Sequence, residues 1–224
     1  MPDPRLTEAR VLKGKATALR NRGEFKRALD ALDEAIRMLE TQLPDYEQMI
    51  INKKELRAEL ADTYGMKGGL FRRLDKLDFA LAAYAMGARI EESDNLSTTY
   101  NRSNVITLSI TAKGLRPTDP EIRRLLVDVI QQLEVDITGP RSDEWWAWSD
   151  LAQFYLLNGE LDKARACYTN ALSKTGATSS EITRHVTILK ELAEMTKESA
   201  PTISEGIGAV IDELAPSRHL EAQG

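Results

Sequence analysis

Cysteine and histidine are scarce in this chain of 224 residues, which has one cysteine and two histidines. The single Cys167 excludes an internal disulfide framework and is typical of a protein of the reducing cytoplasm. His185 and His219 are far apart in the sequence, and neither has the spacing to other ligands that zinc requires. We therefore expect no metal site and no cofactor.

The chain also lacks an excess of basic residues and any long apolar run. Its formal net charge is -5, whereas a general nucleic-acid binder normally needs a basic face. No apolar run approaches the ~20 residues that span a bilayer, and the first residues contain no apolar stretch of a signal peptide. We expect a soluble, cytoplasmic protein with no general nucleic-acid binding and no membrane partner.

Motifs of common enzymes are missing as well. The sequence contains no G-x-S-x-G and no G-x-G-x-x-G, and Gly14-Lys15 lacks the upstream glycine of a phosphate-binding loop. A catalytic pair of Cys167 and His185 is conceivable, but structural roles are favoured because Cys167 adjoins Tyr168 on a packing face. We predict that the protein is not an enzyme, with an enzyme that uses an unrecognised site as the less favoured alternative.

Helical periodicity, by contrast, recurs along most of the chain, and residues 148–172 give its clearest example. Asn158-Gly159 separates two apolar stripes at a place where a helix C-cap favours a left-handed residue. Aromatic and small side chains alternate on these stripes, so that two helices could pack closely. The first stripe holds Trp148, Leu151, Ala152 and Tyr155, and the second holds Leu161, Ala164, Tyr168, Ala171 and Leu172.

Residues 148–171, together with residues 23–36, resemble the tetratricopeptide repeat (TPR) family. This resemblance implies an all-α, TPR-like helical-hairpin solenoid of about four helix pairs plus a C-terminal capping helix. Ala28, Ala80 and Ala164 occupy matching positions, and their spacing indicates units longer than the ~34 residues of a minimal TPR. A narrower resemblance links the chain to the divergent TPR arrays of bacterial effector proteins and of kinase regulatory regions.

The expected domain organisation is one TPR-like solenoid over residues 1–200, closed by a capping helix at 179–199. Residues 201–224 then form a short amphipathic segment and a loose tail. Within the second unit, residues 67–76 add length that either extends both helices or forms a protruding corner. The segment 203–214 docks on an apolar surface, either as a last cap or in the groove of its own or a neighbouring chain, the latter giving a homo-oligomer.

The resemblance implies that the first helices of successive pairs line a concave groove. Trp146 lies off the stripe of Trp148 and either points toward this groove as an interface anchor or packs, with Trp145, on the preceding pair. Thr17 stands where chaperone-binding members of the family have a clamp asparagine, so their carboxylate-binding function is not carried over. The remaining groove residues that we expect are Lys13, Arg20, Glu55, Glu59, Asp62, Asn101, Asn104, Ser149 and Gln153. Their mixed charges predict a ligand with both signs of charge.

Two further surfaces carry functional hypotheses. A basic patch around Gly68-Gly69 could receive an acidic partner or a phosphate, or its side chains could simply stay solvated. It consists of Lys67, Arg72, Arg73 and Lys76. The leading functional prediction is a non-catalytic scaffold or adaptor that binds a protein or peptide. The alternative is a regulatory sensor that binds a small ligand or nucleotide near Tyr100, Asn101, Arg102 and Asn104.

Overall fold

The structure is a computed structural model that describes residues 4–42, 50–139, 141–174 and 177–214. These residues form ten helices and no β-strand, which confirms the all-α prediction. Among them, no helix combines the length and the apolar content that crossing a membrane would take. The tail predicted to be loose, residues 215–224, lies outside the described residues. The helices are α1 (Pro4–Asn21), α2 (Phe25–Gln42), α3 (Ile50–Arg73), α4 (Leu77–Ser93), α5 (Tyr100–Thr111), α6 (Pro120–Thr138), α7 (Trp145–Leu157), α8 (Leu161–Leu172), α9 (Ser179–Thr196) and α10 (Pro201–Leu214).

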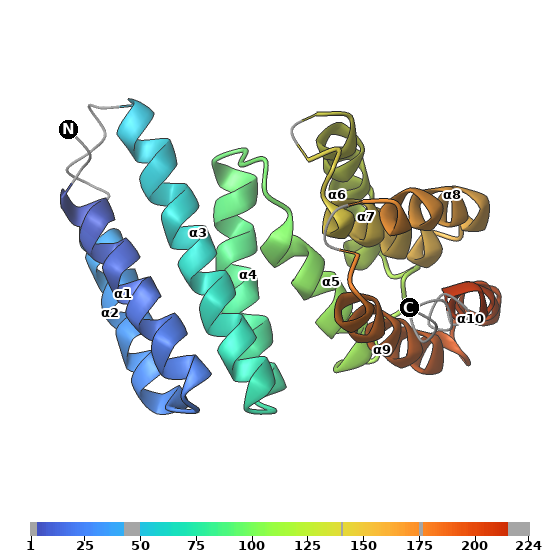
Figure 1. Cartoon of the computed structure of the whole chain (residues 1–224), viewed down its shortest axis with the longest axis horizontal. Helices are drawn as coiled ribbons and strands as arrows, with labels where there is room; N and C mark the ends of the chain where they lie inside the picture. The colour runs from blue at the N-terminus through green and yellow to red at the C-terminus, as the bar shows by residue number, and fades with distance from the viewer. Residues whose placement is uncertain (1–3, 43–49, 140, 175–176, 215–224) are drawn as a thin grey trace, which may run out of the picture. The chain divides into compact units, whose positions relative to one another are not determined.

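The chain divides into two compact units, Met1–Val105 and Ile106–Gly224, and each is described by itself. In the first unit, α1 pairs with α2 and α3 pairs with α4 as helical hairpins, and α2 packs against α3 (Figure 1). Apolar side chains from α1, α2 and α3 form its main core. Leu39, Leu56 and Ala61 of this core are fully buried. The periodic apolar stripes of the sequence therefore meet one another inside helical hairpins.

The same turn ends the first helix of three hairpins. Its left-handed residue is Gly23 (φ 77), Asp75 (φ 56) or Gly159 (φ 80). The N–H of the following residue donates back across the turn at 3.0, 2.9 and 2.8 Å respectively, as in a Schellman C-cap. One turn later an alanine is fully buried in each second helix, at Ala28, Ala80 and Ala164. The three alanines that define the repeat in the sequence therefore occupy the same place in three hairpins.

The additional residues 67–76 mainly lengthen a helix. Helix α3 continues without interruption to Arg73, with Gly68-Gly69 inside it, so a protruding corner is not formed. A Cβ atom on Gly68 would lie 2.8 Å from the ring of Tyr84, and one on Gly65 would lie 2.9 Å from the ring of Tyr100. Glycine weakens a helix interior, but here it leaves the space that two aromatic rings fill.

In the second unit, α7 pairs with α8, α9 pairs with α10, and α6 packs against α7. Residues 100–111, which are rich in β-branched side chains, form α5, and Gly114 (φ 67) follows the helix in a left-handed conformation. Helices α5 and α6 are both present, but α6 packs on α7 and does not form a close hairpin with α5. Local periodicity predicts these two helices, but not which helix α6 packs against.

The amphipathic segment 203–214 forms most of α10. Ile207, Val210 and Leu214 are buried in the second unit, where α10 packs on α9 and contacts α7. Ser204 also donates to the carbonyl of Ala193 at 2.8 Å. The predicted capping helix is therefore one half of a hairpin, and the apolar face of α10 is covered by its own chain. These apolar side chains are not available for the predicted homo-oligomer.

Candidate functional site

The charged residues expected on the groove side of α1 and α3 contact one another. Lys13 of α1 forms ion pairs with both Glu59 and Asp62 of α3. Arg10, one turn earlier on α1, binds Glu55 at 2.8 Å and Glu59 at 3.0 Å. Burial opposes the charge of Lys13, yet its two carboxylate partners hold its pKa above the ordinary value. We call these five residues the ion-pair network.

The ion-pair network shows that charges of both signs, expected to face a ligand, are paired with one another across α1 and α3. Lys13 and Glu59 are largely buried, and each satisfies the charge of the other. Arg20 lies farther along α1 and donates to the side chain of its neighbour Asn21 at 3.2 and 3.3 Å. The sequence interpretation missed Arg10, although its position three residues before Lys13 places it on the same helical face.

The asparagines expected in the groove are also engaged within the first unit. Asn101 is buried, and its amide donates to Glu91 of α4 at 2.8 Å and to the carbonyl of Ala61 at 3.0 Å. Glu91 also accepts the backbone N–H groups of Asn101 and Arg102, so a buried carboxylate caps the first turn of α5. Burial raises the pKa of Glu91, and these donors oppose that rise. The predicted groove residue Asn101 is therefore a structural one.

The residues of the predicted basic patch have different surroundings. Arg72 donates to the side chain of Asn104 at 3.1 Å, so this pair joins α3 to α5. Lys67 binds Asp33 of α2 at 2.6 Å. Arg73 and Lys76 are exposed. Two members of the patch thus hold helices of the first unit together, and two remain accessible to solvent.

Three of the side chains predicted to face the groove from α7, those of Trp145, Ser149 and Gln153, are buried. Trp145 is only 5% exposed, and its ring packs edge-to-face on His185 of α9, with centroids 5.9 Å apart. His185 Nε2 is in turn hydrogen-bonded to Tyr168 Oη of α8 at 2.8 Å. Gln153 is buried and donates to Thr107 of α5 at 3.2 Å. Trp145 and Gln153 therefore belong to the interior of the second unit and not to an open groove.

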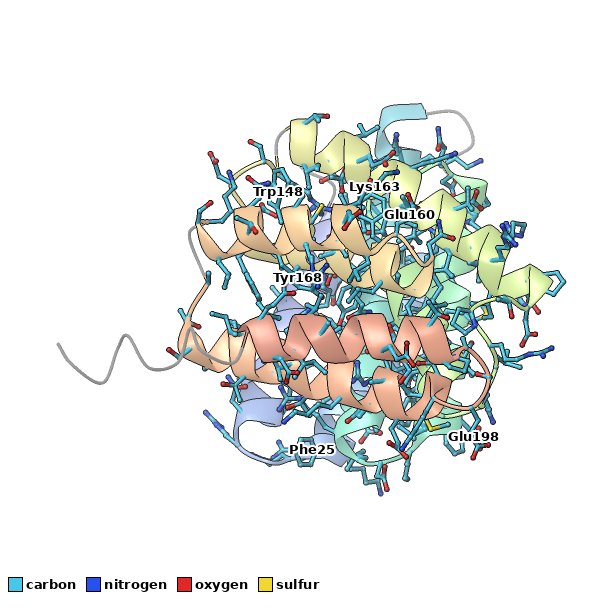
Figure 2. The ribbon with its side chains drawn as sticks, turned by 90° about the vertical axis from the view of Figure 1, so that its right-hand side faces the viewer. Phe25, Trp148, Glu160, Lys163, Tyr168 and Glu198 are labelled. Carbon is cyan, nitrogen blue, oxygen red and sulfur yellow. The ribbon has the colours of Figure 1, made fainter. Side chains whose placement is uncertain are left out.

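Trp146, for which the sequence left both an exposed and a packed position open, is 41% exposed. The guanidinium of Arg141 lies over its ring, with Cζ 4.5 Å from the centroid. Trp148 is partly buried, and its indole N–H donates to the carbonyl of Ser142 at 2.7 Å. Figure 2 shows Trp148 beside α8. Lys174, just after the end of α8, has its Nζ 5.3 Å from the ring centre of Trp148. The three tryptophans thus have three different environments.

An aspartate that the sequence interpretation missed shares the helical face of Trp146. Asp150 lies one turn farther along α7 and is partly buried. Burial raises the pKa of its carboxyl to about 7, although the charge of Arg141 acts in the opposite direction. Arg141 itself binds the buried Asp136 of α6 at 2.8 Å. We call Arg141, Trp146 and Asp150 the α7 surface.

His185 has side-chain partners other than Cys167. The side-chain contacts of His185 are with Tyr168 and Trp145. Burial raises the pKa of the Cys167 thiol to about 11, which leaves little of the nucleophilic thiolate at neutral pH. Within the described part of the chain, no three His, Cys, Asp or Glu side chains are grouped so that they could hold a metal ion.

The comparisons with known proteins give a fold and no family. No protein-family model matches the chain, and no curated protein matches it significantly. Among solved structures, the chain is similar to the crystal structure of BtubC (BKLC) from P. vanneervenii, with a TM-score of 0.54. The match covers 98% of this chain and 89% of that chain at 15% sequence identity. At this identity the likeness shows the fold alone.

Proposed function

We propose that this protein is a non-catalytic, TPR-like interaction scaffold that binds a protein or peptide through the α7 surface. The observation that carries the proposal is Trp146, a large aromatic side chain that is 41% exposed. Burying an exposed tryptophan removes a large apolar area from water, which is why tryptophan is common among interface anchors. The stacked Arg141 also limits the ring to few orientations before a partner arrives.

The recurring hairpins support the scaffold part of this proposal. The turn shared by Gly23, Asp75 and Gly159 is typical of a repeat array, in which binding faces are built on rigid helices. A lone buried Cys167 and a net charge of -5 favour a cytoplasmic protein whose partner is not a nucleic acid. The sensor alternative has less support, because Asn101 and Arg102 are bound to Glu91.

The test is affinity capture of partners by the wild-type chain, by Trp146→Ala and by Phe79→Ala, each read by quantitative mass spectrometry. Phe79 is the matched control, since it is also a large exposed aromatic residue but lies on α4. We expect Trp146→Ala to lose partner proteins that both the wild type and Phe79→Ala capture. The helical circular dichroism of all three proteins should be equal. Identical capture by the wild type and Trp146→Ala would refute the proposal. Stabilisation by nucleotides or metabolites in a thermal screen would favour the sensor.

A further inference from the structure

The α7 surface contains a carboxylate that the described residues leave without a hydrogen bond. Asp150 lies one helical turn from Trp146 on the same face of α7 and is partly buried, with its charge also acting on the buried Tyr168 of α8. Among the described residues, the nearby cation that acts on Asp150 is Arg141. A carboxylate that has lost part of its hydration and has no donor favours the approach of a cation.

Arg141 makes its ion pairs with other carboxylates, so its charge only partly offsets the burial of Asp150. Its guanidinium binds the carboxylate of Asp136 at 2.8 Å and lies 4.0 Å from a carboxylate oxygen of Glu144. Asp143, in the same segment before α7, has a side chain that is 92% exposed and is 3.8 Å from Lys174. Carboxylates therefore outnumber cations around Trp146, and this region complements a positively charged partner.

The second unit repeats one arrangement in which a cation lies between an aromatic ring and a carboxylate. Arg141 contacts Trp146 and Asp136, and Lys174 contacts Trp148 and Asp143. At the start of α8, Lys163 lies 5.0 Å from the ring centre of Tyr155 and 2.6 Å from Glu160; Figure 2 labels Glu160 and Lys163 at this end of the helix. An indole has two faces, and Arg141 covers one face of Trp146.

We propose that the partner segment is basic, and that one of its lysine or arginine side chains lies between the second face of Trp146 and the carboxylate of Asp150. This inference rests on the proposed function, because it names the chemistry of the partner that the α7 surface binds. Arg141, Lys163 and Lys174 each lie between an aromatic ring and a carboxylate. The partner cation would take the same position between Trp146 and Asp150. A guanidinium is the better ligand of the two, since its plane stacks on an indole while its N–H groups reach a carboxylate.

The experiment measures binding of fluorescently labelled dodecapeptide pools to the full chain by anisotropy. Three pools share the same randomised positions and differ at a few fixed positions. These fixed positions carry arginine and lysine in the basic pool, glutamine in the second pool and glutamate in the third. We expect the basic pool to bind at least about tenfold more tightly than the glutamine pool. Trp146→Ala and Asp150→Asn should each remove at least about tenfold of that affinity, a loss typical of interface anchors.

Asp162→Asn is the matched control, because it makes the same carboxylate-to-amide change at an exposed position in the first turn of α8. It should change the affinity by less than about threefold. Wild-type affinity of Asp150→Asn for the basic pool would overturn the inference. Preference for the glutamate pool, with loss on Trp146→Ala, would overturn it and leave the proposed function standing. If no pool binds, the inference fails, and the capture experiment judges the proposed function separately.

Discussion

The face shared by α1 and α3 and the exposed face of α7 both carry carboxylates. On the first face these carboxylates are paired with basic side chains, and on the second face one of them is not. Each of the three carboxylates of the ion-pair network has a basic partner, as Glu59 has in Arg10 and Lys13. On α7, Asp150 has no such partner among the described residues, and Trp146 stays exposed. Charges that satisfy one another between two helices hold a fold together, whereas a charge without a partner is available for recognition.

The largest loss of unfolding free energy is expected on substitution of Glu91, whose ion pair with Arg102 is deeply buried. Glu91→Ala leaves the buried Arg102 without its carboxylate and removes the cap from the first turn of α5. Breaking a buried ion pair from one side costs about 3–5 kcal/mol of unfolding free energy. Urea denaturation followed by circular dichroism measures this loss. The control is Glu92→Ala at the next, exposed position. A loss below about 1 kcal/mol at Glu91 would contradict the capping role.

The pH dependence of stability distinguishes Asp150 from the satisfied carboxylates. Burial lowers the pKa of His185 to about 4 from 6.5, with a smaller contribution from Arg184, so His185 stabilises the fold less as pH falls from 6.5 to 4. Burial raises the pKa of Asp150 from 3.8 to about 7, so Asp150 stabilises the fold less as pH rises through that window. Between about pH 4 and 6.5 the two contributions oppose each other and nearly cancel.

Asp150→Asn removes the contribution of Asp150 to the pH dependence of stability, so that the contribution of His185 is no longer cancelled. The stability of the variant, minus that of the wild type, should rise with pH between about 4 and 6.5 by at most ~1.4 kcal/mol per pH unit. His185→Gln should give a difference of the opposite slope. Chemical denaturation at each half pH unit provides both curves, and groups unaffected by the substitutions cancel in the differences. Difference curves without slope for Asp150→Asn would show that Asp150 is ionised like a surface carboxylate.

Lys13 and Arg20 give a matched test within α1, since the sequence predicts both as groove residues. Lys13→Ala removes the shared partner of Glu59 and Asp62 and should lower the unfolding free energy by about 1–2 kcal/mol. Arg20→Ala loses only contacts to the adjacent Asn21 and should stay within about 0.5 kcal/mol of the wild type. Equal losses, measured by urea denaturation, would show that the ion-pair network contributes no stability.

Local sequence signals predicted the helices but not the partners of their side chains. The stripe that contains Trp148 and the left-handed Gly159 depend on neighbouring residues, and both were predicted. The burial of Trp145 depends on His185, which lies forty residues later on α9. The pairing of Lys13 with Glu59 depends on the register of α1 against α3. Such contacts follow from tertiary packing, which periodicity within one helix does not encode.

A small stability effect is expected at Trp146, where the binding effect should be largest. Trp146→Ala removes an exposed ring and its contact with Arg141, so the unfolding free energy should fall by less than about 1 kcal/mol. Trp145→Ala, one residue earlier, empties a buried site beside His185 and should cost about 3–5 kcal/mol. Thermal and urea denaturation of both variants measure the contrast. Similar losses would mean that Trp146 also supports the core, and its effect on binding would then report folding and not recognition.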